Sequence, residues 1–183
     1  MMTFPRWLTF SAILFFSGII TGFIAPIDFS IESIAPLGEV VDDLGTFSSP
    51  AVFLIILLNN LIAICFAFFL SPLLCIVPLL SLAVNGLLIG VVGSMVVEQE
   101  SFLYLAAGIL PHGIFEIPAL IIALSAALNF GFITIKGLFK KENRGNISPA
   151  FITNIKYLAL AGGLLVPAAF IETFVTPVFL GLF

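Results

Sequence analysis

The sequence predicts an all-α fold, a polytopic transmembrane helical bundle with about five spans. The first observation is composition, because 61% of the 183 residues are hydrophobic and 9% are charged. A soluble domain of this length could not cover so much apolar surface. The second observation is that the apolar runs are continuous, which excludes a barrel of alternating strands. We therefore expect one transmembrane domain, residues 1–183, with the lipid bilayer as its surroundings.

The third observation is that cations and acids occupy different segments. The cations lie near the N-terminus and around one late loop: Arg6, Lys136, Lys140, Lys141, Arg144 and Lys156. Two segments without Lys or Arg carry most of the acids: Asp28, Glu32, Glu39, Asp42, Asp43, Glu98 and Glu100. The positive-inside rule then predicts a multi-pass protein of the cell membrane. Its N-terminus and basic loop 136–150 are expected in the cytoplasm and its C-terminus outside, and nucleic acid is not an expected partner.

Residues 7–25 form the first predicted span, since about 20 apolar residues cross a bilayer. Gly18 and Gly22 form a GxxxG pair, which favours close helix packing. In the predicted outer loop, residues 26–50, apolar residues recur between acids at near-helical spacing. This pattern fits either a short amphipathic helix on the membrane surface or an ordered loop. The second predicted span covers residues 51–70.

A tight turn at Ser71-Pro72 predicts that the second and third spans form an antiparallel hairpin. The third span is expected over residues 73–97 and carries small residues at every fourth position, Gly86, Gly90 and Ser94. The fourth apolar run covers residues 102–135, which is too long for one straight crossing at about 1.5 Å per residue. The fifth span is expected over residues 151–178, broken by Pro167 and by Pro177.

The stretch 110–119 concentrates polar and helix-breaking residues inside the fourth apolar run. It holds Glu116 and the only histidine, His112, together with Pro111, Gly113 and Pro118. An ionisable group at bilayer depth costs roughly 2.5–3.5 kcal/mol on insertion scales, which indicates a function. We expect a helix break near 111–118, with residues 102–110 as a half-helix or re-entrant arm. A new helix beginning at Pro111 would present the positive end of its dipole here.

His112 and Glu116 are four residues apart, so they share one helix face. Three interpretations stay open: a structural hydrogen-bonded pair, a proton or cation relay, and a metal site. Two ligands fall short of the four that Zn²⁺ prefers, so we predict no metal and no cofactor. Glu172 has no cation nearby in sequence and is expected to be neutral or paired across helices. Pro111 to Glu116 and Pro167 to Glu172 share the pattern Pro-x-x-apolar-apolar-Glu, which fits a repeat or chance.

Three asparagines, Asn59, Asn60 and Asn85, lie within the second and third spans. They are expected to form interhelical hydrogen bonds, worth on the order of 0.6–2 kcal/mol each, or to line a pathway. Cys65 and Cys75 are expected to pack as free thiols. No nucleophile-and-base motif or phosphate loop is present, so we predict no catalytic residues and no enzymatic activity.

The stretch 110–119 resembles the signature of the stage II sporulation protein M (SpoIIM) family. Further residues resemble the pattern of that family in the same order: Asn59-Asn60, Pro78, Asn85-Gly86, Gly90, Ile171-Glu172 and Thr176-Pro177. The resemblance covers about residues 51–183. It implies five spans, and the namesake members assemble a peptidoglycan-degrading machine during spore engulfment. In that machine the partners SpoIID and SpoIIP carry the hydrolytic activity, so no catalytic residue is implied here.

Two functions follow as hypotheses. The first is a SpoIIM-like, non-enzymatic membrane protein that organises a membrane complex with membrane or envelope proteins. Small-residue stripes predict that it forms a homo-oligomer, most simply a dimer. The alternative is a small channel or transporter for protons, cations or a small solute, with His112, Glu116 and Glu172 at its site. A site sealed in dry protein would exclude this alternative.

Overall fold

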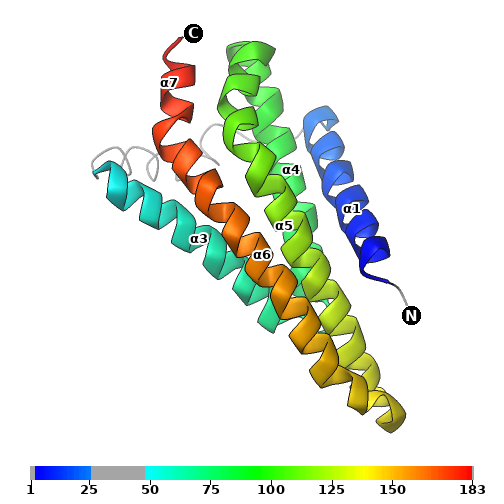
Figure 1. Ribbon diagram of the computed structural model, residues 1–183. Coiled ribbons are helices and arrows are strands. Elements are labelled where there is room, and N and C mark those ends of the chain that lie inside the picture. The colour runs from blue at the N-terminus through cyan, green and yellow to red at the C-terminus, as the bar shows by residue number, and fades with distance from the viewer. Residues whose placement is uncertain (1–2, 26–47, 183) are drawn as a thin grey trace.

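The computed structural model describes residues 3–25 and 48–182, which form a bundle of long helices (Figure 1). The long helices are α1 (Phe4–Ile24), α3 (Ser49–Phe69), α4 (Ile76–Gln99), α5 (Phe102–Phe139) and α6 (Ile147–Phe174). Two short elements, the 3₁₀ helix η1 (Lys141–Asn146) and α7 (Thr176–Leu180), flank α6. Five helical stretches are long and apolar enough to cross a membrane. The predicted all-α transmembrane bundle is confirmed.

The described residues include the predicted hairpin but little of the predicted outer loop. Most of the predicted outer loop, including its amphipathic pattern, lies outside the described residues. The tight turn is present, because α3 ends at Phe69 and α4 begins at Ile76. At this turn Leu74 and Cys75 adopt positive φ angles of 54° and 57°, a conformation that costs energy in residues other than glycine.

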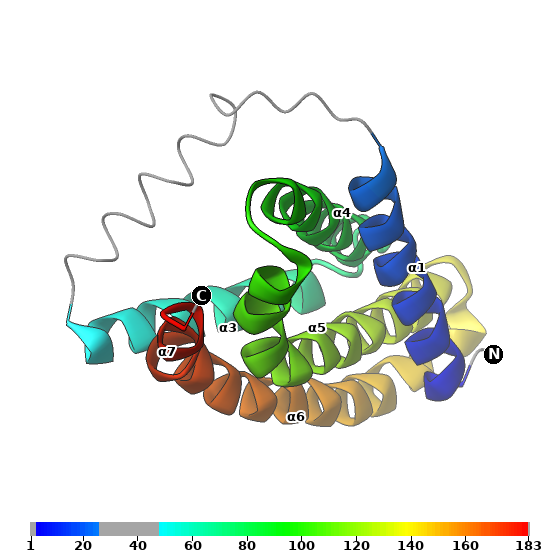
Figure 2. The ribbon, with the colours of Figure 1, turned by 90° about the horizontal axis from the view of Figure 1, so that it is seen from above.

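The predicted break in the fourth span is wrong, since α5 is one helix of 38 residues with Pro111 and Pro118 inside it. A re-entrant arm over residues 102–110 is therefore absent, and α5 bends instead of breaking (Figure 2). Each proline removes a main-chain N–H and crowds the carbonyl four residues earlier. Ending the helix would expose several more main-chain groups to hydrocarbon, which costs more than a bend.

The predicted break at Pro167 is wrong for the same reason, because α6 continues through Pro167 to Phe174. The interruption comes at Val175, and Pro177 lies in the first turn of α7, where a missing N–H is harmless. The hairpin between α5 and α6 is also shorter than the predicted loop 136–150. α5 extends to Phe139, and α6 already begins at Ile147.

Helices α1 and α4 pack with their main chains in contact. A Cβ atom placed on Gly22 would overlap the carbonyl oxygen of Leu87, and one on Gly86 would overlap that of Phe15. Gly90 likewise faces the main chain of α1, where an added Cβ would lie 2.8 Å from the nitrogen of Phe23. The predicted GxxxG pair and the glycines of the third span therefore pack against each other inside one chain.

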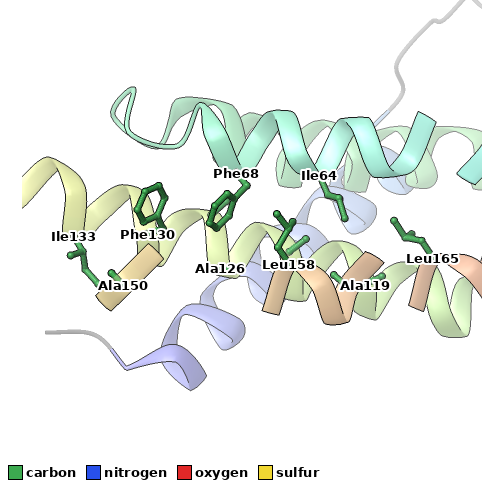
Figure 3. Packing of buried hydrophobic residues seen from close by; sticks show 12 residues of the cluster. Ile64, Phe68, Ala119, Ala126, Phe130, Ile133, Ala150, Leu158 and Leu165 are labelled. Atoms are coloured by element: carbon green, nitrogen blue, oxygen red, sulfur yellow. The ribbon is translucent and has the colours of Figure 1, made fainter. Parts of the chain in front are cut away.

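Helix α5 lies at the centre of the bundle and contacts α1, α3, α4 and α6. Its small residues Ala119, Ala123 and Ala127 are fully buried. Figure 3 shows the core in which Ala119 and Phe130 of α5 meet side chains of α3 and α6. The α3 and α6 residues labelled there are Ile64, Phe68, Ala150, Leu158 and Leu165. The larger side chains of the neighbouring helices thus fill the space beside the alanines.

The hairpin of α5 and α6 extends past the other helices at one end of the bundle (Figure 1). Phe4, at the start of α1, stacks on Tyr157 of α6 with ring centroids 3.7 Å apart. Ile147 begins α6 ten residues earlier, so the hairpin projects by about 15 Å beyond α1. The cations of the hairpin lie at this end, and the C-terminal end of the described chain lies at the other. That the basic end faces the cytoplasm stays a prediction.

The contact of α1 with α4 predicts that Gly90→Ala destabilises the protein. The added methyl would force the two main chains apart, at a cost of about 1–3 kcal/mol. Gly163→Ala is the matched control, because a Cβ on Gly163 of α6 meets nothing within 4 Å. Thermal unfolding in detergent should show a lower midpoint for Gly90→Ala and an equal or higher one for Gly163→Ala. Equal midpoints for both variants would contradict main-chain contact between α1 and α4.

Candidate functional site

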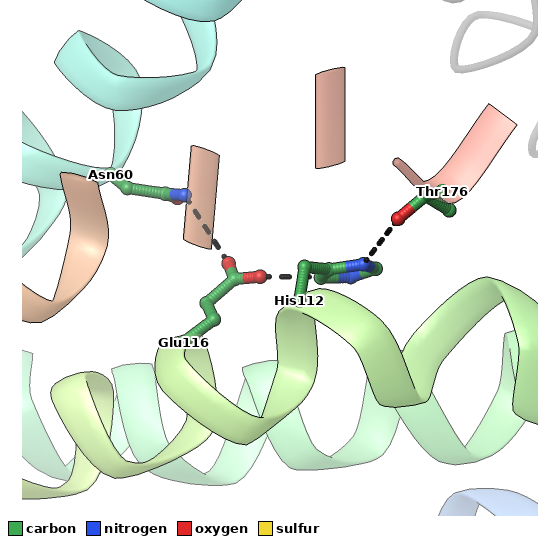
Figure 4. A network of polar contacts seen from close by, with 4 residues as sticks. All are labelled: Asn60, His112, Glu116 and Thr176. Atoms are coloured by element: carbon green, nitrogen blue, oxygen red, sulfur yellow. Dashed lines mark hydrogen bonds and ion pairs between the residues drawn. The ribbon is translucent and has the colours of Figure 1, made fainter. Parts of the chain in front are cut away.

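Polar side chains from α3, α5 and α7 meet in the interior of the bundle (Figure 4). Asn60 of α3 donates a hydrogen bond from Nδ2 to Oε1 of Glu116 on α5, at 3.2 Å. The other carboxylate oxygen of Glu116 lies 3.8 Å from Nε2 of His112, one turn earlier on α5. Nδ1 of His112 in turn lies 3.4 Å from Oγ1 of Thr176 on α7. These contacts tie α3, α5 and α7 together through one chain of polar groups.

Glu172 of α6 completes the group, which we call the polar cluster: Asn60, His112, Glu116, Glu172 and Thr176. One ligating atom each from His112, Glu116 and Glu172 can be chosen so that all three lie within 4.8 Å of one another. The two segments that share the predicted pattern, which end at Glu116 and Glu172, therefore place their carboxyl groups close together. Whether these segments form a true repeat stays a prediction. Two acids and one imidazole therefore share a single site.

Among the described residues, no lysine or arginine forms an ion pair with these acids. In residues 3–25 and 48–182, the ion pair of the cluster is the contact between His112 and Glu116. The nearest cation along α5 is Lys136, 20 residues and about 30 Å from Glu116. On α6, Lys156 precedes Glu172 by 16 residues, which is about 24 Å. At most the imidazole can offset one of two negative charges.

The local helix geometry differs from the prediction in one respect. Pro111 lies inside α5 instead of at the start of a helix, so the predicted helix N-terminus at Pro111 is absent from the cluster. The spacing of His112 and Glu116 still places both on one face, as predicted. Pro111 and Pro118 leave the carbonyls of Ala107 and Ile114 without their regular helical partners. Helix α5 is thus least regular where the polar side chains project.

The cluster lies well inside the span. Glu116 follows the start of α5 by 14 residues, which corresponds to about 21 Å along the helix. Asn60 is the twelfth of the 21 residues of α3 and therefore lies near the middle of that helix. The hydrocarbon core of a bilayer is about 30 Å thick. Polar groups at these positions are surrounded by apolar helix surface above and below.

Two cavities meet at Glu116. One, of about 60 Å³, is lined by polar groups of Asn60, Ser81 and Asn85 as well as by Glu116. The other, of about 190 Å³, also reaches His112. A cavity needs only about 10–15 Å³ to hold a water molecule, so both are large enough. The side chains of Glu116 and His112 are 32% and 17% exposed, so the cluster has open space beside it.

The three asparagines singled out in the sequence lie in different surroundings. Asn60 alone among them forms an interhelical hydrogen bond in the described part of the chain. Asn85 donates to the carbonyl of Ser81 on its own helix, at 2.8 Å, and lines both cavities. Asn59 is exposed on the outer face of α3. Within one chain, the described residues therefore give Asn59 and Asn85 no interhelical hydrogen bond, and for Asn59 a bond to a second chain stays a prediction.

Sequence reasoning missed polar residues that connect helices. The buried Asn129 of α5 donates to Oδ1 of Asn154 on α6, at 3.1 Å. Asn154 also donates to the carbonyl of Ala150, at 2.8 Å. An asparagine within an apolar run is the same signal that singled out Asn60, so both could have been found. Thr176 gave no such signal by its chemistry, because a threonine is common in membrane helices and hydrogen-bonds locally, although Thr176-Pro177 belongs to the family pattern found in the sequence.

The fold and the site define a polytopic helical membrane protein with a cluster of ionisable residues inside its bundle. The sequence matches the family of stage II sporulation protein M over residues 11–177, and the chain belongs to that family. It is 31% identical over 177 residues to an uncharacterized protein of Methanocaldococcus jannaschii, covering 96% of each chain. No solved structure matches the chain. The predicted resemblance is confirmed, and the match also includes most of α1.

The hydrogen bond between Asn60 and Glu116 predicts energetic coupling of α3 to α5. In a double-mutant cycle with Asn60→Ala and Glu116→Ala, the coupling energy should be about 0.6–1.7 kcal/mol, from the average to the largest value for polar pairs in membrane helices. Unfolding in mixed micelles measures it. The control cycle pairs Asn154→Ala with Glu116→Ala, whose positions share no contact, and should give a coupling near zero. Coupling of equal size in both cycles would argue against a direct bond.

Proposed function

We propose that this protein is a non-enzymatic scaffold that organises a membrane complex as a homodimer, paired through the outer face of α3. The observation that carries the proposal is the exposed amide of Asn59. Asn59 is the eleventh of the 21 residues of α3, at the middle of the helix. No hydrogen bond to it is found within the described residues. In a bilayer this amide would face hydrocarbon, where an unpaired polar group is costly.

A second copy of the chain is the partner that best suits this amide. An asparagine side chain carries both a donor and an acceptor, so two Asn59 side chains can pair across a two-fold axis. Such an interface is self-complementary, as dimer symmetry requires. The same face presents exposed apolar residues one turn away in either direction, Ile55 and Ile62. These would pack against their own copies around the asparagine pair.

The small-residue stripes give no support to this dimer. Gly18, Gly22, Gly86 and Gly90 are used in the contact of α1 with α4, and the alanines of α5 are buried in the core. The outer face of α3 is a separate surface, so forming a dimer would leave these contacts unchanged. The scaffold role itself is a proposal, supported by membership of the family. Membrane or envelope proteins are the partners that such a role requires.

The orientation in the membrane belongs to the same proposal. The basic hairpin of α5 and α6 projects from the bundle, and the positive-inside rule assigns it, with the N-terminus, to the cytoplasm of a cell. The C-terminal end of α7 then faces outside. In this orientation a scaffold would offer the projecting hairpin to cytoplasmic partners and its opposite end to envelope partners.

The dimer predicts a specific cross-link. In a chain with Cys65→Ala and Cys75→Ala, Ile62→Cys should form a disulfide-linked dimer in native membranes under mild oxidation. Adding Asn59→Leu should weaken the dimer about 3- to 30-fold, as expected for a loss of 0.6–2 kcal/mol. Leu80→Cys, at an equally exposed site on α4, is the matched control. A chain that cross-links equally at both positions, or at neither, would not be paired through α3.

A second candidate function is transport of protons or cations through the polar cluster. The observation that favours it is that Glu116 and His112 border two cavities and are partly exposed. Ionisable groups that border a cavity inside a helical bundle are typical of transport sites. A scaffold has no evident need for two unbalanced carboxyl groups at this depth. The two functions are compatible, because the cluster and the outer face of α3 are separate.

Transport predicts a flux that depends on Glu116. Proteoliposomes with an ion-sensitive dye should show flux for the wild type at about pH 5.5 or about pH 7.5, a range over which histidine changes charge. Glu116→Gln removes the acid but keeps the shape, so flux should fall to the level of protein-free liposomes. Glu98→Gln, at the far end of α4, should leave it unchanged. Wild-type liposomes that are as tight as empty ones would rule out transport of the tested ions.

A further inference from the structure

We propose that His112, Glu116 and Glu172 bind a divalent transition-metal ion of the Zn²⁺ type inside the bundle. From the sequence alone, only His112 and Glu116 could be counted as ligands, which is too few. The fold brings a third ligand from α6, and the ligating atoms of all three lie within 4.8 Å of one another. Ligand atoms around one tetrahedral Zn²⁺ lie about 3.3 Å apart, because each bond is about 2.0 Å long. Small side-chain rotations would close this difference.

The charge of the ion fits the site. Two carboxylates and a neutral imidazole carry two negative charges, and a divalent cation cancels both. No lysine or arginine of the described residues cancels these charges, because Lys136 and Lys156 lie about 30 Å and about 24 Å along their helices from Glu116 and Glu172. A buried charge is tolerated when it is paired or coordinates a metal. Metal binding thus accounts for both acids at once, whereas a structural hydrogen bond accounts only for Glu116.

The contacts around His112 have the form of a metal-ligating histidine. Such a residue usually donates its second ring N–H to an oxygen, which fixes the tautomer and the ring orientation. Oγ1 of Thr176 lies 3.4 Å from Nδ1 of His112 and can accept that proton. The lone pair of Nε2 then points toward the carboxyl group of Glu116 (Figure 4). Asn60 holds the same carboxyl group by its other oxygen, so both ligands of α5 are oriented by neighbours.

The donor set selects the class of ion. One imidazole nitrogen and two carboxylate oxygens suit Zn²⁺ and similar first-row ions, whereas Mg²⁺ prefers oxygen ligands alone. A fourth ligand can be water, for which the cavity beside His112 and Glu116 has room. The proposal does not rest on the dimer of α3, and it holds for a structural ion as well as for a transported one.

Metal binding by the purified full-length protein tests the proposal. Protein in detergent is stripped with a chelator, incubated with Zn²⁺, freed of unbound ion and analysed for metal content. We expect about one Zn²⁺ per chain, the content of a single site. Glu172→Gln and His112→Gln should each weaken binding by more than about 100-fold, the upper end of the loss caused by removing a residue that only supports a metal ligand. Glu98→Gln is the matched control and should bind as the wild type does.

Three results would overturn the proposal: no Zn²⁺ on the wild type, equal loss in Glu98→Gln, or displacement of Zn²⁺ by equimolar Mg²⁺. If a variant elutes as an aggregate, the proposal is tested instead by Co²⁺ binding to the wild type. Bound Co²⁺ should give visible absorption bands of a four- or five-coordinate nitrogen and oxygen site, and their absence also overturns the proposal. Zn²⁺ binding without flux would leave the site intact and remove the transport function, so the two failures are distinguishable.

Discussion

A helix in a bilayer must satisfy its main-chain hydrogen bonds internally, because hydrocarbon offers no partner. The rest of this structure depends on that constraint, and α5 shows it most clearly. Two prolines and a glycine within eight residues would end a helix in water, yet α5 continues from Phe102 to Phe139. Its continuity keeps His112 and Glu116 on one face. The same constraint carries α6 through Pro167 and so brings Glu172 to the level of Glu116.

Close packing of small residues provides the second part of the architecture. The hydrophobic effect does not drive helices together in lipid, so association relies on contact area and on polar pairs. Glycines bring the main chains of α1 and α4 together, and the alanines of α5 admit the larger side chains of α3 and α6. Once these surfaces are used, the outer face of α3 still carries, at the middle of the helix, the amide of Asn59, which has no hydrogen-bond partner in the described part of the chain. The fold therefore separates an internal polar cluster from an external surface that could bind a partner.

Much of the fold could be predicted from the sequence because its signals are local. Apolar runs predict the spans, the turn at Ser71-Pro72 predicts the hairpin, and the glycine spacing indicates faces that do pack closely. The errors concern helix ends and prolines. Pro111 and Pro167 are interpreted as breaks by rules that hold in water, where exposed main-chain groups find partners. That the glycine face of α1 meets α4, and that the glycines pair within one chain, depends on three-dimensional packing that spacing does not encode.

The site could be predicted only where its members share a helix. His112 and Glu116 were paired by their spacing, but the distance of Glu172 from them depends on how α5 and α6 are packed. Thr176 is a neighbour of His112 only because α6 ends at Phe174 and α7 then packs against α5. Once these residues are together, the charge of the site becomes the decisive question. Two carboxyl groups without a lysine or arginine must be neutralised by protons, by a metal ion or by a partner. Metal binding and transport are both proposed because these carboxyl groups must be neutralised. A cluster that is neutralised by an exchangeable cation can bind that cation and release it.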